Sequence, residues 1–481
     1  MEGFSEKYGM EFKKAYWDEI PDSYLMERHG REISPLLHRR WMFAGVQNFL
    51  LYDFFSNSGI VDDNVYVYSN GEGSERALVI FNNQYNSTSG WIKTSTAYLQ
   101  KSQGEDRSLV QKSLVEGLGL HPSPGSFVIY TDAITGLQYI RPSQELADRG
   151  MFQELSGFKY HVYWGFHQVQ DDSYHSYQNL CSYLQGRGVP NIQEALSELI
   201  LQPIQQPFRE IANPGYFQYL LDHRITNVDD VLPAHLLAEA EEKMASFING
   251  VSRHKGYTHN RDEILDTIAP TISSVLSLPI WNQREPASAR LIQEAITYLQ
   301  DGLDPSTHWI TLLGWVFTHE LGRLAGGNQP STQTITWLDE WKLGSMLSDN
   351  MQAMGYEESK AWRMHQTLRI LISHQDWYDD DGTLPTLEII KHWLQDPEIQ
   401  QFLGVHRHKE ILWFNKESLE TLVWWMSLIS VIRARCSPGK TQVEWKETLL
   451  GVREISSAIL KASKTSGYQL EILLSLLEKD I

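Results

Sequence analysis

Two segments of the sequence come close to metal-binding motifs, and both lack a required ligand. His319-Glu320 begins like the zinc motif H-E-x-x-H, but position 323 is Arg, so the second zinc ligand is missing. The segment Trp377–Gly382, followed by Glu388, matches several positions of a calcium-binding loop, yet Trp377 occupies the first position, where a carboxylate is required. We interpret the first as a helix-face His beside a solvated Glu and the second as an acidic turn that caps a helix. The sequence therefore predicts no metal site and no cofactor.

Motifs for nucleotide binding and for nucleophilic catalysis are also missing. The sequence contains no P-loop, no dinucleotide-binding glycine pattern and no nucleophile elbow. Cys181 and Cys436 each lie in a helical pattern without an adjacent His, so we interpret both as packing residues. No residue is predicted to be catalytic from its motif.

Charge and cysteine content narrow the class of protein further. The 481 residues include 41 Lys and Arg against 60 Asp and Glu, a formal net charge of −19, which argues against binding to nucleic acid or to an anionic membrane. Two cysteines cannot form a disulfide framework, and the charged first residues do not resemble a signal peptide. The longest apolar stretch, 422–432, is too short to span a bilayer. We predict a cytoplasmic protein.

The hydrophobic pattern changes character twice along the chain. From Arg28 to Phe55 apolar residues recur at helical spacing, and turn residues follow up to Gly59. Short β-rich runs then take over, separated by turns, which predicts an antiparallel β-sandwich over 59–172. The predicted strands are 65–68, 77–81, 91–99, 127–130, 137–140 and 160–169.

After residue 172 nearly all of the pattern is helical. Asn191 is expected to cap a helix that continues through Ile200, and a second helix is expected from Pro233 to a stop at Asn249-Gly250. Further helices are predicted over 288–301, 306–324, 334–349, 359–374, 386–396, 416–435, 443–463 and 467–478. The predicted fold class is α+β and multidomain, with regions 1–58, 59–172 and 173–481.

Several segments then match a known architecture in order. They are Glu2–Phe12, Ala15–Glu19, Ser34–Arg40, Phe49–Phe55, Val65–Tyr68, Arg76–Asn83, Leu184–Pro190 and Glu194–Leu196. Together they resemble the region that follows the catalytic barrel in large bacterial proteins of the α-amylase family of glycoside hydrolases. The resemblance implies that 1–58 is a remnant of the (β/α)₈ barrel, followed by the β-sandwich and a helical C-terminal domain.

The resemblance also implies what this chain lacks. The catalytic carboxylates of the family lie on barrel strands four, five and seven, and the chain is expected to begin after strand eight. It therefore implies a non-catalytic portion of a glycoside hydrolase that acts on α-glucans. The implied partners are an α-glucan or maltooligosaccharide, together with the missing catalytic barrel or another protein. An orphaned barrel helix is expected to leave Leu36, Leu37, Trp41 and Phe43 unburied.

Sugar contacts are predicted in two places. Residues that follow barrel strand eight would border the substrate cleft, and exposed aromatic side chains on the sandwich could stack on sugar rings. The predicted substrate-binding residues are Glu2, Glu6, Lys7, Tyr8, Trp17, Tyr85 and Trp91. The competing interpretation of these aromatic residues is core packing.

One alternative function comes from a different class. The chain could be a free-standing interaction protein whose helical half binds a protein partner. The two hypotheses differ in whether aromatic residues such as Tyr85 and Trp91 bind sugar.

Overall fold

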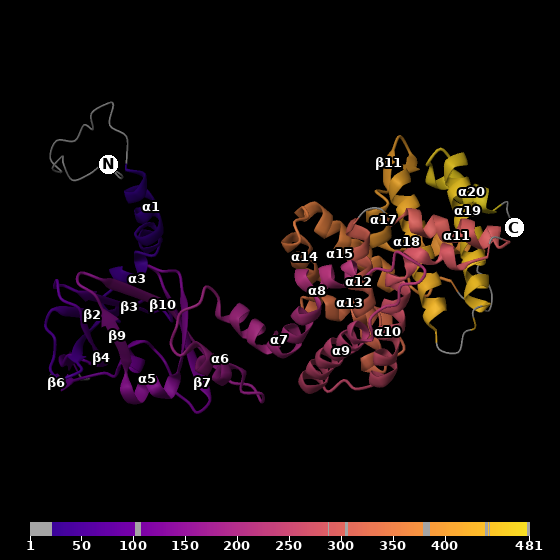
Figure 1. The fold of residues 1–481 in the computed structure, drawn as a ribbon. Helices are drawn as coiled ribbons and strands as arrows, with labels where there is room; N and C mark the ends of the chain where they lie inside the picture. The colour runs from indigo at the N-terminus through magenta and orange to yellow at the C-terminus, as the bar shows by residue number, and fades with distance from the viewer. Residues whose placement is uncertain are drawn as a thin grey trace. The chain divides into compact units, whose positions relative to one another are not determined.

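The computed structural model describes residues 22–101, 107–286, 288–303, 306–378, 385–437, 441 and 443–478. Its elements fall into two compact units, one ending at Ile200 and the other beginning at Leu201 (Figure 1). The first unit combines a sheet with short helices, and the second is helical. The chain is thus a mixed α and β protein with a helical C-terminal region, as the sequence predicts; the predicted domain limits at 58 and 172 stay predictions.

The first unit contains most of the strands. Its elements are α1 (Ser23–Glu32), α2 (Ser34–His38), α3 (Trp41–Ala44), β1 (Leu50–Ser56), β2 (Val65–Asn70), β3 (Ala77–Asn82), β4 (Thr88–Ser95), β5 (Tyr98–Lys101), β6 (Arg107–Val110), α4 (Leu114–Gly117), β7 (Ser126–Asp132), β8 (Gln138–Pro142), α5 (Ser143–Arg149), β9 (Met151–Leu155), β10 (Tyr160–Gln170), α6 (Ser176–Leu184) and the start of α7 (Ile192–Ile211). Eight strands form one antiparallel sheet in the order β8-β7-β10-β3-β2-β1-β4-β9, and β5 pairs with β6.

One hydrophobic core lies against the inner face of this sheet. It collects side chains from strands across the whole order, from Val128 and Tyr130 on β7 to Met151 and Leu155 on β9. Helix α4 adds Leu114, and it begins with a capping box formed by Ser113 and Glu116. The second face is covered only in part, where α6 and the start of α7 pack on β7 and β8 through a smaller cluster.

The predicted hairpins 65–81 and 127–140 are confirmed as β2–β3 and β7–β8. A sandwich of two packed sheets is not confirmed, because the eight strands belong to one hydrogen-bonded sheet. The predicted helical pattern up to Phe55 is wrong at its end: β1 starts at Leu50. There Leu50, Tyr52 and Phe54 are buried while the residues between them are not, which is the period of a strand.

The second unit is built almost wholly from helices. Its elements are the rest of α7, α8 (Pro214–Asp222), α9 (Ala234–Lys255), α10 (Arg261–Leu276), η1 (Leu278–Ile280), η2 (Asn282–Arg284), α11 (Arg290–Asp301), α12 (Ser306–Thr318), η3 (Leu321–Ala325), α13 (Pro330–Glu340), α14 (Leu343–Ala353), α15 (Glu358–Ser373), α16 (Thr386–Gln395), α17 (Pro397–Phe402), β11 (His406–His408), β12 (Ile411–Trp413), α18 (Lys416–Cys436), α19 (Glu444–Thr465) and α20 (Leu470–Glu478). One large core joins them, and Trp281, Trp315, Trp337, Trp341, Trp393 and Trp425 are fully buried in it.

Most predicted helices of this unit are confirmed, with three corrections. The predicted helix 306–324 ends as α12 at Thr318, and the short 3-10 helix η3 follows from Leu321. Helix α9 does not stop at Asn249-Gly250 but runs on to Lys255, where Gly256 adopts a left-handed conformation with φ 72°. The predicted helix 334–349 is divided into α13 and α14 at Lys342, whose φ is 56°. Among the helices of the described ranges, none is long and apolar enough to cross a membrane.

Candidate functional site

Three aromatic side chains form a lateral row on the outer face of the sheet. Strands β1, β4 and β9 are neighbours, and their register pairs Phe55 with Trp91 and Trp91 with Phe152. Directly paired residues project on the same side of a sheet. Their chain neighbours Ile92 and Met151 are buried in the core, so the row faces away from it. We call Phe55, Trp91 and Phe152 the aromatic row.

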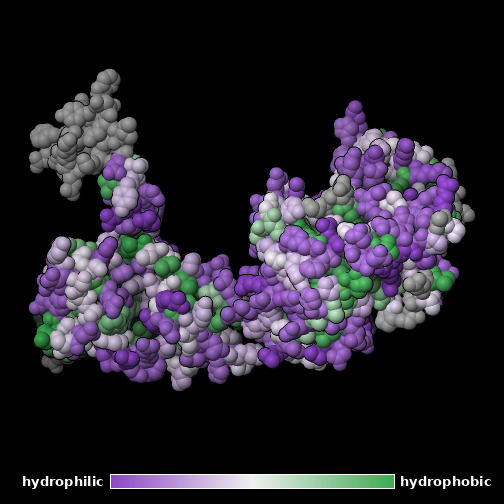
Figure 2. Space-filling view, viewed as in Figure 1, coloured by the Kyte–Doolittle hydropathy of each residue, from purple (hydrophilic) through white to green (hydrophobic). Residues whose placement is uncertain are grey.

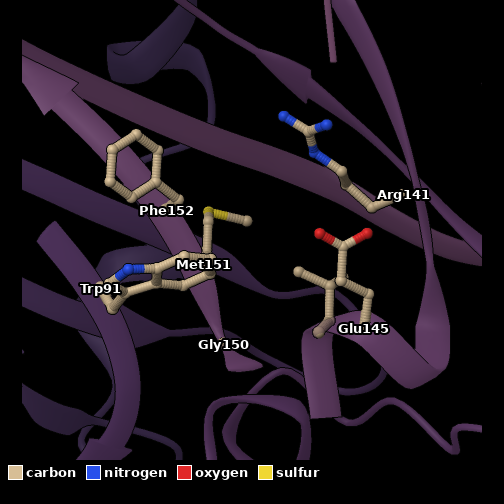
Figure 3. A pocket seen from close by; sticks show the side chains of 7 residues that line it. Trp91, Arg141, Glu145, Gly150, Met151 and Phe152 are labelled. Atoms are coloured by element: carbon tan, nitrogen blue, oxygen red, sulfur yellow. The ribbon is translucent and has the colours of Figure 1, made fainter. Parts of the chain in front are cut away.

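A pocket of about 280 Å³ opens beside the aromatic row. Its lining residues are Trp91, Arg141, Glu145, Leu146, Gly150, Met151 and Phe152. Arg141 lies on β8 and Phe152 on β9, the two end strands of the sheet, so the sheet curls until its ends face each other across this pocket. Helix α5 joins these two strands, and it holds Glu145 at the pocket. Figure 3 shows the Trp91 and Phe152 rings on one side of the pocket and Arg141 and Glu145 on the other.

The ring of Trp91 is held by two neighbours. Its centroid lies 5.2 Å from that of Phe152, with the ring planes 55° apart. The guanidinium carbon of Arg149, at the end of α5, lies 4.8 Å from the Trp91 centroid, which is a cation–π contact. Phe152 retains 37% of its surface exposed, whereas Trp91 is half-buried. The exposed apolar surface of the row is therefore supplied mainly by Phe152.

The two charged residues that line the pocket differ in how firmly they are held. The Arg141 guanidinium packs against Gly186, where an added Cβ would lie 2.4 Å from Nη1. It also lies near the Tyr130 hydroxyl. Burial raises the pKa of Tyr130 to about 12, although the Arg141 charge opposes that rise. Glu145 is half-buried and has no ion-pair partner among the residues that the structure describes. Its carboxylate is thus an acceptor that a neutral hydroxylated ligand could use.

The predicted sugar-binding residues do not come together in this site. Glu2, Glu6, Lys7, Tyr8 and Trp17 lie outside the described residues. Trp91 lines the pocket. Tyr85 lies in the turn between β3 and β4, where it is 84% exposed and contacts Phe158 edge to face at 6.5 Å. Tyr85 does not line the pocket, so the structure separates it from Trp91.

Sequence reasoning missed Phe55, Phe152, Arg149 and Glu145. The sequence pattern places Phe55 at the end of a helix and predicts no strand over β9, which carries Phe152. Burial alternates along β1 and β9, but the sequences Leu-Leu-Tyr-Asp-Phe-Phe-Ser and Met-Phe-Gln-Glu-Leu do not alternate between apolar and polar residues, so they carry no clear strand signal. Their pairing with β4 could not be found from the sequence either, because register depends on contacts far apart in the chain.

The motif-like segments take structural positions. His319 is buried, stacks on Trp315 with the ring centroids 3.9 Å apart, and donates from Nδ1 to the Trp315 carbonyl at 2.9 Å. Trp377 is buried and donates from Nε1 to the Met426 carbonyl at 3.1 Å, while residues 379–384 of the calcium-like loop lie outside the described residues. Within the described part of the chain, no group of three or more His, Cys, Asp or Glu side chains could hold a metal ion.

Comparison with known proteins adds no relative. No protein-family model, no curated protein and no solved structure matches the chain. The resemblance to the α-amylase family thus stays a prediction, and it depends on the short segments quoted from the sequence.

Proposed function

We propose that this chain is a non-catalytic, α-glucan-binding portion of an α-amylase-like glycoside hydrolase, and that the aromatic row and its pocket are the sugar site. The observation that carries the proposal is the register of β1, β4 and β9, which aligns Phe55, Trp91 and Phe152. A row of rings offers flat apolar area, and the Glu145 carboxylate and the Arg149 guanidinium beside it offer an acceptor and a donor for sugar hydroxyls.

Exposed apolar residues before the sheet support the second part of the proposal, contact with a catalytic barrel. Of the four residues expected to be unburied, Leu37 is 56% exposed and Trp41 is 41% exposed, whereas Leu36 and Phe43 are half-buried. Figure 2 shows hydrophobic surface where α3 meets the sheet unit. We call Leu37 and Trp41 the apolar patch. In the proposed architecture the last strands of the barrel cover this patch.

Affinity electrophoresis tests the sugar site. The purified chain should migrate more slowly in a gel that contains soluble starch, and both Trp91→Ala and Phe152→Ala should abolish most of that retardation. Tyr174→Ala is the matched control, because Tyr174 is 83% exposed in the same unit and lies outside the pocket. Retardation that all three variants share would place the sugar elsewhere and would contradict the proposed site.

A second assay separates the proposed function from its alternatives. The purified chain should release no reducing ends from starch or maltooligosaccharides, and measurable release would contradict the non-catalytic part of the proposal. Absence of retardation together with a stable protein complex would instead favour the interaction-protein hypothesis.

A further inference from the structure

A second pocket lies within the helical unit, far along the sequence from the aromatic row. It has a volume of about 430 Å³, which is enough for a small organic molecule. Its lining residues are Ile225, Asp230, Val231, Leu232, Leu237, Pro270, Ser273, Ser274, Ser277, Arg284, Arg435 and Cys436. One part of the lining is aliphatic and the other carries arginines and hydroxyls. We call this the helical-unit pocket.

Arg435 is held at this pocket by aromatic rings instead of by a carboxylate. Its guanidinium carbon lies 4.6 Å from the ring centroid of Trp281 and 4.7 Å from that of Trp445. In the described part of the chain Arg435 makes no ion pair, and the nearby Glu285 is already paired with Lys446 at 2.6 Å. Burial lowers the pKa of Arg435, which reflects the cost of holding this charge away from water.

Arg284 brings a second positive charge to the same pocket. It is exposed, and among the described residues it too has no ion-pair partner. Asp230 is the one carboxylate in the lining, and it is exposed and accepts a hydrogen bond from the Asn227 amide at 3.0 Å. No ion pair joins Asp230 to either arginine within the described ranges. The two guanidiniums thus leave an uncompensated positive charge that an anion would neutralise.

A buried hydroxyl in the lining has only a weak hydrogen-bonding neighbour among the described residues. Ser274 is 5% exposed, and its Oγ makes no hydrogen bond of good geometry there, while the Cys436 thiol, a weak hydrogen-bonding group, lies beside it. Its neighbours are occupied: Ser277 Oγ donates to the Ser274 carbonyl and accepts from Trp281 Nε1, and the Cys436 thiol donates to the Pro270 carbonyl. A buried hydroxyl beside a thiol is poorly satisfied, so Ser274 keeps a donor that an anion at the pocket wall could accept.

We propose that the helical-unit pocket binds a small organic anion with a phosphate or carboxylate head group. The head group would pair with Arg435 and Arg284 and accept a hydrogen bond from Ser274 Oγ. The apolar part of the ligand would lie against Ile225, Leu232 and Leu237, the aliphatic part of the lining. This site is independent of the proposed glucan site, since the two pockets share no residue.

Calorimetric titration of the full chain tests the proposal with defined probes. Hexyl phosphate or hexanoate should bind with a saturable heat, and the affinity should fall as salt is raised, because ions screen the exposed Arg284. Hexanol shares the apolar part and lacks the charge. Equal binding of hexanol, or no binding of either anion, would overturn the proposal.

Variants then locate the site. Ser274→Ala removes a hydroxyl whose neighbour is the weakly bonding Cys436 thiol, so it should change folding stability little while weakening anion binding. Arg284→Gln should weaken binding about tenfold or more. Arg253→Gln is the matched control, because Arg253 is an exposed arginine of α9 outside the pocket, and it should bind as the native chain does. Native affinity in both Ser274→Ala and Arg284→Gln would overturn the assignment.

Discussion

His319 shows how a residue that looks chemical in the sequence becomes structural in the fold. Its imidazole is buried, and its Nε2 lies 3.6 Å from Glu320 Oε1. Glu320 in turn pairs with Arg323 Nη1 at 3.0 Å, and Arg323 stands where a zinc motif would have its second His. The prediction that His319 is not a zinc ligand rested on that Arg alone, and the structure gives the Arg a partner. What the sequence could not predict is the burial of His319, because burial comes from packing on distant helices.

This burial has a consequence for stability against pH. Burial lowers the pKa of His319 below its ordinary value of 6.5, so the unfolded chain takes up a proton more readily than the folded one. The contribution of neutral His319 to the free energy of unfolding is complete above pH 6.5. It is lost as the pH falls toward the pKa that His319 has in the folded chain. The free energy of unfolding, measured by urea titration, should therefore decrease between pH 7.5 and pH 5.

His319→Gln should make that decrease smaller. The exposed His406→Gln serves as the control and should keep the native pH dependence. An equal slope in the native chain and in His319→Gln would show that other groups cause the decrease.

At the scale of elements, amphipathic helices were predictable and strand partners were not. The predicted helix 416–435 is α18, and the Asn191 cap is present, since its Oδ1 accepts from the backbone N–H of Gln193 at 2.8 Å. These features depend on neighbours a few residues away. By contrast, β1 and β9 do not follow from the sequence, because their apolar residues do not alternate and each strand is completed by pairing with β4, a partner distant in sequence. The aromatic row could not be predicted for the same reason, apart from Trp91.

The wrong stop at Gly250 has a packing explanation that can be tested. Helix α9 passes α7 at this residue, and an added Cβ would lie 2.4 Å from the Pro203 carbonyl oxygen. Gly250→Ala should therefore force the two helices apart and cost about 1–3 kcal/mol of unfolding free energy. Urea unfolding should show a lower midpoint at an unchanged slope.

Gly215→Ala is the matched control for that substitution. Gly215 lies in helix α8, and its added Cβ would meet only the Asn213 side chain at 3.5 Å, an ordinary contact. This variant should be as stable as the native chain or slightly more stable. A Gly250→Ala chain with the same unfolding midpoint as Gly215→Ala would contradict the close approach of α7 and α9.

At the scale of the whole molecule, each of the two units has its own hydrophobic core. The helical unit is the larger and contains the proposed anion pocket, while the sheet unit holds the proposed glucan site. Only the sheet unit carries the apolar patch of Leu37 and Trp41. This division suggests that the two proposed sites can be altered independently, since residues without shared partners contribute additively.

The apolar patch predicts self-association of the isolated chain. If Leu37 and Trp41 belong to a face that a barrel covers, as proposed, light scattering of the chain should give a mass that rises with concentration above 55.5 kDa. The double substitution Leu37→Ser and Trp41→Ser should bring the mass back to that of a monomer. Leu109→Ser, which alters a residue that is 69% exposed elsewhere in the unit, should not. A native chain that is monomeric at every concentration would count against a covered face.

Hydrogen–deuterium exchange of the full chain with and without maltoheptaose tests the proposed glucan site most directly. Sugar binding at this site should slow exchange in peptides that cover β4 and the segment from α5 to β9, which surround the aromatic row and its pocket, and should leave 201–481 unchanged. Slower exchange confined to the helical unit, or no change in exchange anywhere at saturating sugar, would contradict the proposed glucan site.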